Sequence, residues 1–561
     1  MSMEWYNDIS KLFMSRGYLR KGQTIEEKIE EIADHSTKIL KKDDYYKNRL
    51  INHLTEGNYV VPTPVWKNFN SYTSETPISC FGVYIEDTVE SIILKAAEVA
   101  LQNKIGGGSS GTFEAVRGRG DKIGEEGFSN GSVSMMQIYQ TISSTISQPN
   151  RRGHFSATQN IEHKDSSEFM GARTEGHAIQ DLSTGLTATD EYMLKVLAGD
   201  DESVEKFRRL VRARYETGFH YVFFTDTVNK NTVDVYRDKK YKIHHSNMCQ
   251  EICLPNSKDE TFVCNLLGMN LVNFDKWKDT DAIEIGIYFM DSMLQDFISK
   301  MKLKKEENED YYNVLYKPAV TFAERHMSMG MGASGLHSYL QSKSISFDSI
   351  IGRSLNKKIF KTIQDHAYKA SEKMAIEYGK PEMLEEAKYK RRHCTLTAVA
   401  PNTSSSFIMG QQSQSIEPMI SNYYVKDVAK SRISFRNPYL EKLLIEKGKN
   451  NENVWLSILK NEGSVRELDF LTEEEKSIFR TFIEIPQTSI IEMASDRQKF
   501  ICQSQSLNLM VGKDTTPDEV CYWILKAWKL GVKTLYYQLN VNSAQDFTNK
   551  RAKNECESCA G

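Results

Sequence analysis

The 561-residue sequence contains no run of about 18 consecutive apolar residues, the length that a membrane-spanning helix requires. Its first residues also lack a basic segment followed by an apolar one, the signature of a secretion signal, so we expect a cytoplasmic protein with no membrane contact. Nine cysteines, an odd number without regular spacing, argue against the disulfide framework of a small secreted protein.

No charge of one sign dominates either. Lys and Arg total 72 and Asp and Glu total 75, for a net charge of −3, which argues against a polybasic nucleic-acid binder. Hydrophobic residues make up 40% and charged residues 26% of the chain, a composition typical of a globular protein. The length excludes a single small module, and no internal repeat is evident.

Short apolar segments alternate with amphipathic segments along most of the chain, which favours an α/β fold with a largely parallel sheet. Residues 24–42 place isoleucines at helical spacing after Thr24, with Glu27 completing a capping box, so residues 1–62 are expected to form a small helical region. Residues 78–85 alternate as a strand does, and Asp87 to Glu90 predicts the cap of a helix over 88–103.

Three further segments are expected to be irregular. Residues 106–131 are rich in glycine and predict a loop, although they lack the GK[ST] of a P-loop and the GxGxxG fingerprint. The charged stretch 300–310 predicts a solvated loop. From Asn542 onward the chain is polar without an apolar period, which predicts a flexible tail.

Asn247, Cys249 and Glu251 form the most informative short pattern. On an extended backbone, side chains at i, i+2 and i+4 point to one side. An amide, a thiol and a carboxylate there could hold a hydroxylated substrate, attack it and move a proton. The alternative is an ordinary strand with a buried cysteine, and Cys253 fits that structural role better.

Two other cysteine patterns leave alternatives open. Cys249, Cys253 and Cys264 with His244 and His245 could bind zinc, although no C-x2-C pair is present to supply the usual ligand turn. At the end of the sequence, Cys556 and Cys559 form a C-x-x-C pair, which is either a mobile dithiol or an incidental frayed end.

The tyrosine pair and the polar loops are ambiguous when taken singly. Tyr536 and Tyr537 end a strand-like run and would face opposite sides of a regular strand, so a stacked pair requires the backbone to depart from it. The serine run 401–406 could cradle a phosphate or cap a helix. Four arginines near the Gly-rich segment could pair with phosphates or simply be exposed: Arg117, Arg119, Arg151 and Arg152.

The order of these segments resembles the large (alpha) subunit of aerobic, class I ribonucleotide reductase, from about Thr63 to the end of the sequence. The matching segments are Pro62-Thr-Pro64, Ile78-Ser-Cys80, the Gly106 to Asp121 region, Asn247-Met-Cys-Gln-Glu-Ile252, Cys264-Asn-Leu, Pro401-Asn-Thr-Ser-Ser, Ser415-Ile-Glu-Pro418, Gly531-Val-Lys-Thr-Leu-Tyr-Tyr537 and Cys556-x-x-Cys559. The resemblance implies a ten-stranded α/β barrel with a central finger loop over 63–541, between the helical region 1–62 and a redox tail over 542–561.

The resemblance also implies roles for the central pattern. Cys249 corresponds to the cysteine that becomes a thiyl radical and abstracts the ribose 3′-hydrogen. Glu251 corresponds to the general base for the 3′-hydroxyl, and Asn247 to the residue that holds the substrate hydroxyls.

For the remaining cysteines, Cys80 and Cys264 resemble the redox pair that ends turnover as a disulfide. Cys556 and Cys559 resemble the tail dithiol that reduces this pair by exchange and is itself restored by thioredoxin or glutaredoxin.

Tyr536 and Tyr537 resemble the stacked pair that relays the radical from a separate metal-bearing small (beta) subunit. The chain itself is therefore expected to bind no catalytic metal.

Nucleotide contacts follow from the same resemblance. Substrate binding is expected at Thr63, Ser79, Cys80, Asn247, Glu251, Thr403, Ser404 and Ser405. Asp87 and Arg117 match the site of a dNTP or ATP specificity effector at a homodimer interface, although Asp87 could be only a helix cap. The loop 148–153 would report effector identity to the substrate pocket.

The sequence departs from longer relatives in three places. Residues 1–61 contain no Lys-Arg-Asp-Gly element of an N-terminal ATP-cone, so overall control by ATP and dATP through this chain is not expected. Thr403 stands where some relatives have glutamate, and Arg151-Arg152-Gly153 departs from more glycine-rich loops.

Two other functions are compatible with parts of the pattern. An adenosylcobalamin-dependent reductase shares the Asn-x-Cys-x-Glu logic but needs no tyrosine pair. A zinc-binding or thiol-disulfide exchange protein would use the cysteines alone.

Overall fold

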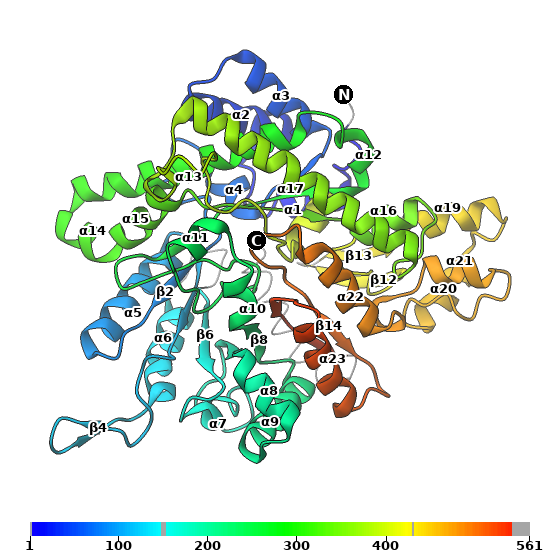
Figure 1. The fold of residues 1–561 in the computed structure, drawn as a ribbon. Helices are drawn as coiled ribbons and strands as arrows, with labels where there is room; N and C mark the ends of the chain where they lie inside the picture. The colour runs from blue at the N-terminus through cyan, green and yellow to red at the C-terminus, as the bar shows by residue number, and fades with distance from the viewer. Residues whose placement is uncertain (1–2, 147–152, 429–430, 541–561) are drawn as a thin grey trace.

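The structure is a computed structural model that describes residues 3–146, 153–428 and 431–540. Its centre is a curled seven-stranded sheet (Figure 1) in the order β15-β8-β7-β6-β3-β2-β9. The five inner strands pair in parallel, and the two edge strands pair antiparallel to them. The strands are β2 (Cys80–Tyr84), β3 (Gly108–Thr112), β6 (Phe155–Asn160), β7 (Ser183–Ala188), β8 (Tyr221–Phe224), β9 (Phe262–Cys264) and β15 (Thr534–Leu535).

Smaller pairings extend the strand arrangement. β10 pairs in parallel with β11 and antiparallel with β1, β14 pairs in parallel with β16, and single bridges join Met331 to Thr397 and Val399 to Gln505. Two hairpins, β4–β5 and β12–β13, lie apart from these sheets. The strands are β1 (Tyr59–Val60), β4 (Lys122–Ile123), β5 (Gly127–Phe128), β10 (Leu266–Asn270), β11 (Gly330–Ser334), β12 (Tyr423–Val428), β13 (Ser431–Arg436), β14 (Leu509–Val511) and β16 (Gln538–Asn540).

One face of the central sheet is lined by small and hydroxylated side chains. Directly paired residues point to the same face, and the register pairs Cys80 with Gly108, Ser110 with Ser156, and Ser156 with Ser183. On the opposite face Ser109 bonds to Gln102 of a covering helix at 2.6 Å. The hydroxylated face is therefore the inner face of the curl.

Helices surround this sheet (Figure 1). α5 packs on β2 and β3, α6 packs on β6, and α13 and α17 pack on β10 and β11. The helices before β10 are α1 (Asp8–Met14), α2 (Ile25–Leu40), α3 (Asp44–Thr55), α4 (Thr63–Asn68), α5 (Val89–Lys104), α6 (Ser132–Thr145), α7 (Ser166–Phe169), α8 (Asp190–Ala198), α9 (Asp201–Thr217), α10 (Thr225–Lys230) and α11 (Asp234–Asp238).

The second half of the chain adds a long helical pair and a lateral group, α19 to α21, which projects from one side in Figure 1. The helices are η1 (Leu271–Asn273), α12 (Phe274–Trp277), α13 (Ala282–Glu307), α14 (Glu309–Leu315), α15 (Lys317–His326), α16 (Leu336–Ser342), α17 (Ile350–Tyr378), η2 (Glu382–Leu384), α18 (Thr403–Ile408), α19 (Pro438–Glu446), α20 (Glu452–Lys460), α21 (Glu473–Ile478), η3 (Phe482–Glu484), α22 (Gln487–Gln498) and α23 (Pro517–Lys529).

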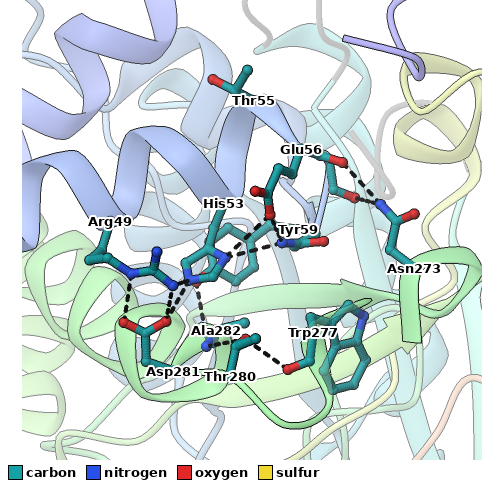
Figure 2. A network of polar contacts seen from close by, with 12 residues as sticks. Arg49, His53, Thr55, Glu56, Tyr59, Asn273, Trp277, Thr280, Asp281 and Ala282 are labelled. Carbon is teal, nitrogen blue, oxygen red and sulfur yellow. Dashed lines mark hydrogen bonds and ion pairs between the residues drawn. The ribbon is translucent and has the colours of Figure 1, made fainter. Parts of the chain in front are cut away.

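Helix α2 begins as the sequence predicts, and a polar network fixes α3 to the body. Thr24 and Glu27 form the expected capping box of α2. At the end of α3, the Arg49 guanidinium and the His53 ring, whose Nε2 lies at 2.9 Å, hold the carboxylate of Asp281 before α13 (Figure 2). These hydrogen bonds hold the pKa of Asp281 down at about 2 despite its partial burial.

Two segments expected to be loops are regular. Residues 300–310 continue α13 and begin α14, where pairs such as Lys304 with Glu307 stabilise an exposed helix. The segment is therefore not a loop, and it is largely solvated except at Lys300 and Met301, which are buried. The Gly-rich segment contains the strand β3. Glycine is needed at two of its positions, because a side chain at Gly108 would collide with Met248 and one at Gly111 with Phe155.

Within the described ranges, no helix is both long enough and apolar enough to cross a membrane.

Candidate active site around residues 247–252

Asn247, Cys249 and Glu251 lie on a tight turn and not on the extended strand that the spacing predicts. Gln250 has a φ of 68°, its N–H donates to Asn247 O at 3.2 Å, and Asn247 N–H donates to Ile252 O at 3.2 Å. The functional side chains are therefore gathered by a turn, which strand periodicity could not reveal.

Three consecutive carbonyls of this turn are held by two neighbouring segments. Cys249 O accepts from the Ser506 hydroxyl at 2.5 Å, and Gln250 O accepts from the Thr534 hydroxyl at 2.9 Å. Glu251 O accepts from the N–H of Ser504 at 2.9 Å. Because these donors are fixed in buried extended chain, the left-handed backbone at Gln250 is stabilised.

A line of aromatic side chains leads to Cys249. Its thiol is buried, and the Tyr536 hydroxyl lies 3.6 Å from Cys249 Sγ. The Tyr536 and Tyr537 rings lie 4.2 Å apart between centroids, at 57°. These two residues fall between β15 and β16, so the backbone departs from a regular strand, as close packing of adjacent rings requires.

A third tyrosine, which no sequence pattern distinguishes, lies in the same cluster. Tyr221, on the inner face of β8, lies 4.8 Å from the Tyr536 ring and 5.0 Å from the Tyr537 ring. Its hydroxyl donates to Ser183 Oγ at 3.3 Å, which lies 2.8 Å from His154 Nε2. The only sequence signal was an aromatic residue in a buried strand, which is ordinary core composition.

Glu251 is fully enclosed and electrostatically unusual. Burial raises the pKa of its carboxyl to about 7, while hydrogen bonds from Asn247 and from Ser506 Oγ, at 3.1 Å, oppose the rise. A carboxyl that titrates near neutrality can both accept and return a proton, which suits general acid–base work.

Cys80 and Cys264 are 184 residues apart in sequence and directly opposite in the β2–β9 ladder. Both are buried free thiols, and Asn247 Nδ2 lies 3.3 Å from Cys80 Sγ. Burial and the neighbouring Cys80 raise the pKa of Cys264 well above its ordinary value. The ladder thus places the two thiols beside each other and beside the turn.

The residues expected to hold substrate phosphate lie on two adjoining segments. Ser79 N–H donates to Cys264 O at 3.2 Å, directly before Cys80. Ser405 Oγ donates to Val61 O at 3.1 Å, so the serine run adjoins the segment that contains Thr63. The serines lie within α18 and not before it, because the helix begins at Thr403, with Asn402 at the N-cap position and no side-chain cap hydrogen bond.

Two other predicted contact residues, Thr403 and Ser404, lie on α18, and a buried carboxyl, Glu417, lies on the matched segment 415–418. The Thr403 hydroxyl lies 3.4 Å from Gln414 Oε1, and Ser404 is buried in the same helix. Glu417 was named from the sequence only as part of a matched segment, and the structure shows that it is buried. Burial raises the pKa of its carboxyl to about 8, although hydrogen bonds from Asn508 oppose the rise.

Asp87 and Arg117 meet far from the turn. Arg117 Nε donates to Asp87 Oδ2 at 2.6 Å and its backbone N–H donates to Oδ1 at 3.0 Å. The cap of α5 is Thr88, which accepts from Ser91 N–H, so Asp87 is not the cap and Glu90 closes no capping box. Residues 148–152 of the predicted reporting loop lie outside the described residues, and so do Cys556 and Cys559.

The zinc alternative finds no support in the described part of the chain. Both ring nitrogens of His245 lie near backbone carbonyls, Ser246 O at 2.8 Å and Val83 O at 3.1 Å, and His244 is paired with Glu114. Cys253 packs near Ser504 and Lys533, and burial raises its pKa to about 12. No group of three or more His, Cys, Asp or Glu side chains there could hold a metal ion.

Comparisons with known proteins agree with this geometry. The chain matches the family described as "Ribonucleotide reductase, barrel domain" over residues 78–208, 202–394 and 385–538. It is 32% identical over 511 residues to a putative ribonucleoside-diphosphate reductase large subunit of Frog virus 3, covering 87% of each chain. It is 30% identical over 609 residues to the ribonucleoside-diphosphate reductase large subunit of Invertebrate iridescent virus 3, covering 92% of this chain and 93% of that one.

Among solved structures, the class Id ribonucleotide reductase alpha subunit of Actinobacillus ureae superimposes with a TM-score of 0.89 at 41% identity. The match covers 97% of this chain and 98% of the other. Sequence, fold and the grouped cysteines lead to one assignment: the chain belongs to the class I-like ribonucleotide reductase large-subunit family.

Proposed function

We propose that this chain reduces ribonucleoside diphosphates to 2′-deoxyribonucleotides through a thiyl radical on Cys249. The observation that carries the proposal is the position of this thiol. The Tyr536 hydroxyl lies 3.6 Å from the sulfur of Cys249. The turn that contains Cys249 also carries Glu251 and Asn247, and the Asn247 amide contacts Cys80.

The residues divide the chemistry as follows. A Tyr536 phenoxyl radical takes the hydrogen atom of the Cys249 thiol, and the resulting thiyl radical takes the 3′-hydrogen of the ribose. Glu251 accepts the 3′-hydroxyl proton, and Asn247 orients the hydroxyls. The environment of Glu251 supports this role, since a pKa of about 7 leaves the carboxylate available at neutral pH.

The redox pair supplies the reducing equivalents. Cys80 and Cys264 together give up two hydrogen atoms, the 2′-hydroxyl leaves as water, and the pair ends as a disulfide. Cys249 returns the hydrogen atom to C3′ and becomes a thiyl radical again, and Glu251 returns the proton to the 3′-hydroxyl. The thiyl radical then takes a hydrogen atom back from Tyr536. The register of β2 against β9 supports this pairing. Cys556 and Cys559 then reduce the disulfide by exchange and are restored by thioredoxin or glutaredoxin.

A separate small subunit supplies the radical in this proposal, and Tyr537 with Tyr536 carries it to Cys249. The supporting observation is the contact between the two rings. In this proposal the metal belongs to the small subunit, and the large subunit binds no catalytic metal itself.

We further propose that the strands form the ten-stranded barrel of the family, with residues 247–252 as its finger loop. A series of pairings leads from β9 round to β15. β10, which follows β9 in the chain, pairs in parallel with β11, and single bridges then run through Thr397 and Gln505. A hydrogen bond from Tyr536 N–H to Leu507 O completes the series next to β15. The absence of a side chain on Gly108, where Met248 packs, supports insertion of the loop against the inner face.

Substrate and effector sites complete the proposal. Thr63, Ser79 and Thr403 to Ser405 hold the substrate phosphates. Asp87 and Arg117 bind a dNTP or ATP at a homodimer interface, supported by the exposed apolar side chains Val89, Ile93 and Leu94 at the start of α5. Overall activity is not switched by ATP and dATP through residues 1–62.

The test is deoxyribonucleotide formation from the four ribonucleoside diphosphates, with dithiothreitol, effectors and the small subunit, in the presence and absence of adenosylcobalamin. Activity that requires the small subunit and not the cobalamin is the expected result. Activity with cobalamin alone would establish the adenosylcobalamin-dependent alternative, and no activity under either condition would remove the proposal.

A further inference from the structure

One hydroxyl contacts both the radical turn and the general base. Ser506 Oγ lies 2.5 Å from Cys249 O and 3.1 Å from Glu251 Oε2, and the side chain is fully buried. The backbone of Ser506 is fixed independently, because its N–H donates to Val399 O at 2.9 Å.

A serine hydroxyl has a single hydrogen and therefore donates to one of these two acceptors at a time. An ionised carboxylate is the stronger acceptor, since charge-assisted hydrogen bonds are about twice as strong as neutral ones. A protonated Glu251 no longer competes, and the hydrogen then belongs to the carbonyl of Cys249.

We propose that Ser506 is a positioning residue that couples the protonation of Glu251 to the position of the Cys249 backbone by passing one hydrogen bond between them. Proton uptake by Glu251 transfers the bond to Cys249 O, and proton release transfers it back. The catalytic meaning of this exchange rests on the proposed function, whereas the hydrogen-bond exchange itself does not.

The proposal predicts a specific change in acidity. Removing the Ser506 hydroxyl removes a donor to the ionised form of Glu251 and leaves the burial of the carboxyl in place. The proton affinity of Glu251 therefore rises, because the charged form loses more than the neutral form. A serine that only packed the turn would leave this affinity unchanged.

Ser504 is the matched control. It lies two residues earlier in the same segment, is equally buried, and its hydroxyl lies 2.7 Å from Thr534 Oγ1. Only its backbone N–H contacts Glu251, and Ser504→Ala keeps that donor.

The measurement is a pH titration of the Glu251 carboxyl by infrared difference spectroscopy on the full chain, with the band assigned by its loss in Glu251→Gln. Ser506→Ala is expected to move the midpoint to higher pH by about one unit, a roughly tenfold rise in proton affinity. Ser504→Ala is expected to keep the wild-type midpoint. An unmoved midpoint in Ser506→Ala, or an equal shift in both variants, would overturn the proposal.

Two further variants keep the test decisive. Ser506→Thr retains the hydroxyl and should restore the wild-type midpoint. If Ser506→Ala does not fold, Ser506→Cys takes its place. Its thiol is similar in size to the hydroxyl but is a weak donor, so the midpoint should shift in the same direction.

Turnover separates this inference from the proposed function. With the small subunit present, Ser506→Ala should lose more activity at about pH 6.5 than at about pH 8.5, because a larger fraction of Glu251 is protonated at the lower pH. Equal losses at both pH values would count against the coupling. An active Glu251→Gln would remove the general-base role while leaving the infrared result intact.

Discussion

The Tyr536 hydroxyl lies 3.6 Å from the sulfur of Cys249, which shares its turn with Glu251, and in the proposed mechanism this sulfur is the atom on which turnover depends. Cys249→Ser is expected to abolish deoxyribonucleotide formation, because the stronger O–H bond of serine does not form the radical. The fold should be retained, since the side chains are similar in size. Thermal unfolding checks the fold, and Cys253→Ser serves as the matched buried control, expected to stay active. Turnover by Cys249→Ser would contradict the radical mechanism.

Three tyrosine rings touch one another, and only two are proposed to carry the radical. Tyr537→Phe is expected to stop turnover without weakening nucleotide binding, because the ring packing stays and only the oxidisable hydroxyl is lost. Tyr221→Phe, in the same cluster, is the control and should retain turnover. Both are checked by steady-state turnover and equilibrium nucleotide binding, and an active Tyr537→Phe would remove the relay.

The buried carboxyl of Glu417 imposes a cost on stability that depends on pH. The pKa of Glu417, about 8, lies above the ordinary value of a glutamate. Its contribution to the free energy of unfolding is therefore most favourable below the unfolded pKa of about 4.3 and is lost as pH rises through the folded pKa. Glu417→Gln should therefore raise the melting temperature more at pH 8 than at pH 5, by an amount corresponding to a few kcal/mol at most. Equal effects at both pH values would show that Glu417 is ionised and paired.

At the scale of elements, a buried ion pair within α5 is linked by a hydrogen bond to the residue before β9. Glu98 accepts from Lys95 Nζ at 2.8 Å, from Gln102 at 3.1 Å and from Thr261 Oγ1 at 2.6 Å, just before the strand that carries Cys264. Removing one partner of a buried pair leaves the other charge uncompensated.

Lys95→Met should therefore lower the free energy of unfolding by about 3–5 kcal/mol, and adding Glu98→Leu should recover much of the loss. Denaturant unfolding measures both. The exposed pair of Lys361 and Asp365 provides the comparison, because Lys361→Met should change stability by less than about 1 kcal/mol. A Lys95→Met variant as stable as wild type would show that the pair contributes nothing.

Asp281 joins α3 to α13 in the network of Figure 2. Its pKa is depressed to about 2, so its stabilising contribution is fully present above the unfolded pKa of about 3.9 and is lost as pH falls through about 2. Asp281→Asn should cost about 1–2 kcal/mol at pH 7, because the site is partly exposed, and the deficit should shrink toward pH 2. Unfolding at both pH values tests this, with the exposed Asp279→Asn as control. A loss of unfolding free energy that is the same at both pH values would contradict the depressed pKa of Asp281.

At the scale of the whole molecule, the parts of the site come from every third of the chain. Cys80 lies on β2 and Tyr536 directly follows β15, the edge strand of the same sheet, whereas the turn at 247–252 and Ser506 lie outside its strands. Serine, threonine and glycine occupy most inner-face positions of β3, β6 and β7, so these strands lack the continuous apolar runs that buried parallel strands usually show. This is why β3 was predicted to be a loop.

The α/β fold class, the capping box of α2 and the candidate reactive residues could be predicted from the sequence. Short motifs carry their chemistry in residue type and local spacing, and these do not depend on the rest of the fold. Asn247, Cys249, Glu251 and the tyrosine pair could therefore be named, although the turn that groups the first three could not.

The contacts between distant residues required the folded chain. The family resemblance named Cys80 and Cys264 as a pair, but their direct adjacency depends on strand register, and the contacts of Ser506 and Tyr221 join residues separated by hundreds of positions. Local propensity contains no information about such pairings, because they are fixed by the closure of the sheet and by packing against glycines that leave room for a neighbour. The same burial set the acidity of Glu251 and Glu417, which depends on water being excluded by the folded chain and not on any neighbour in the sequence.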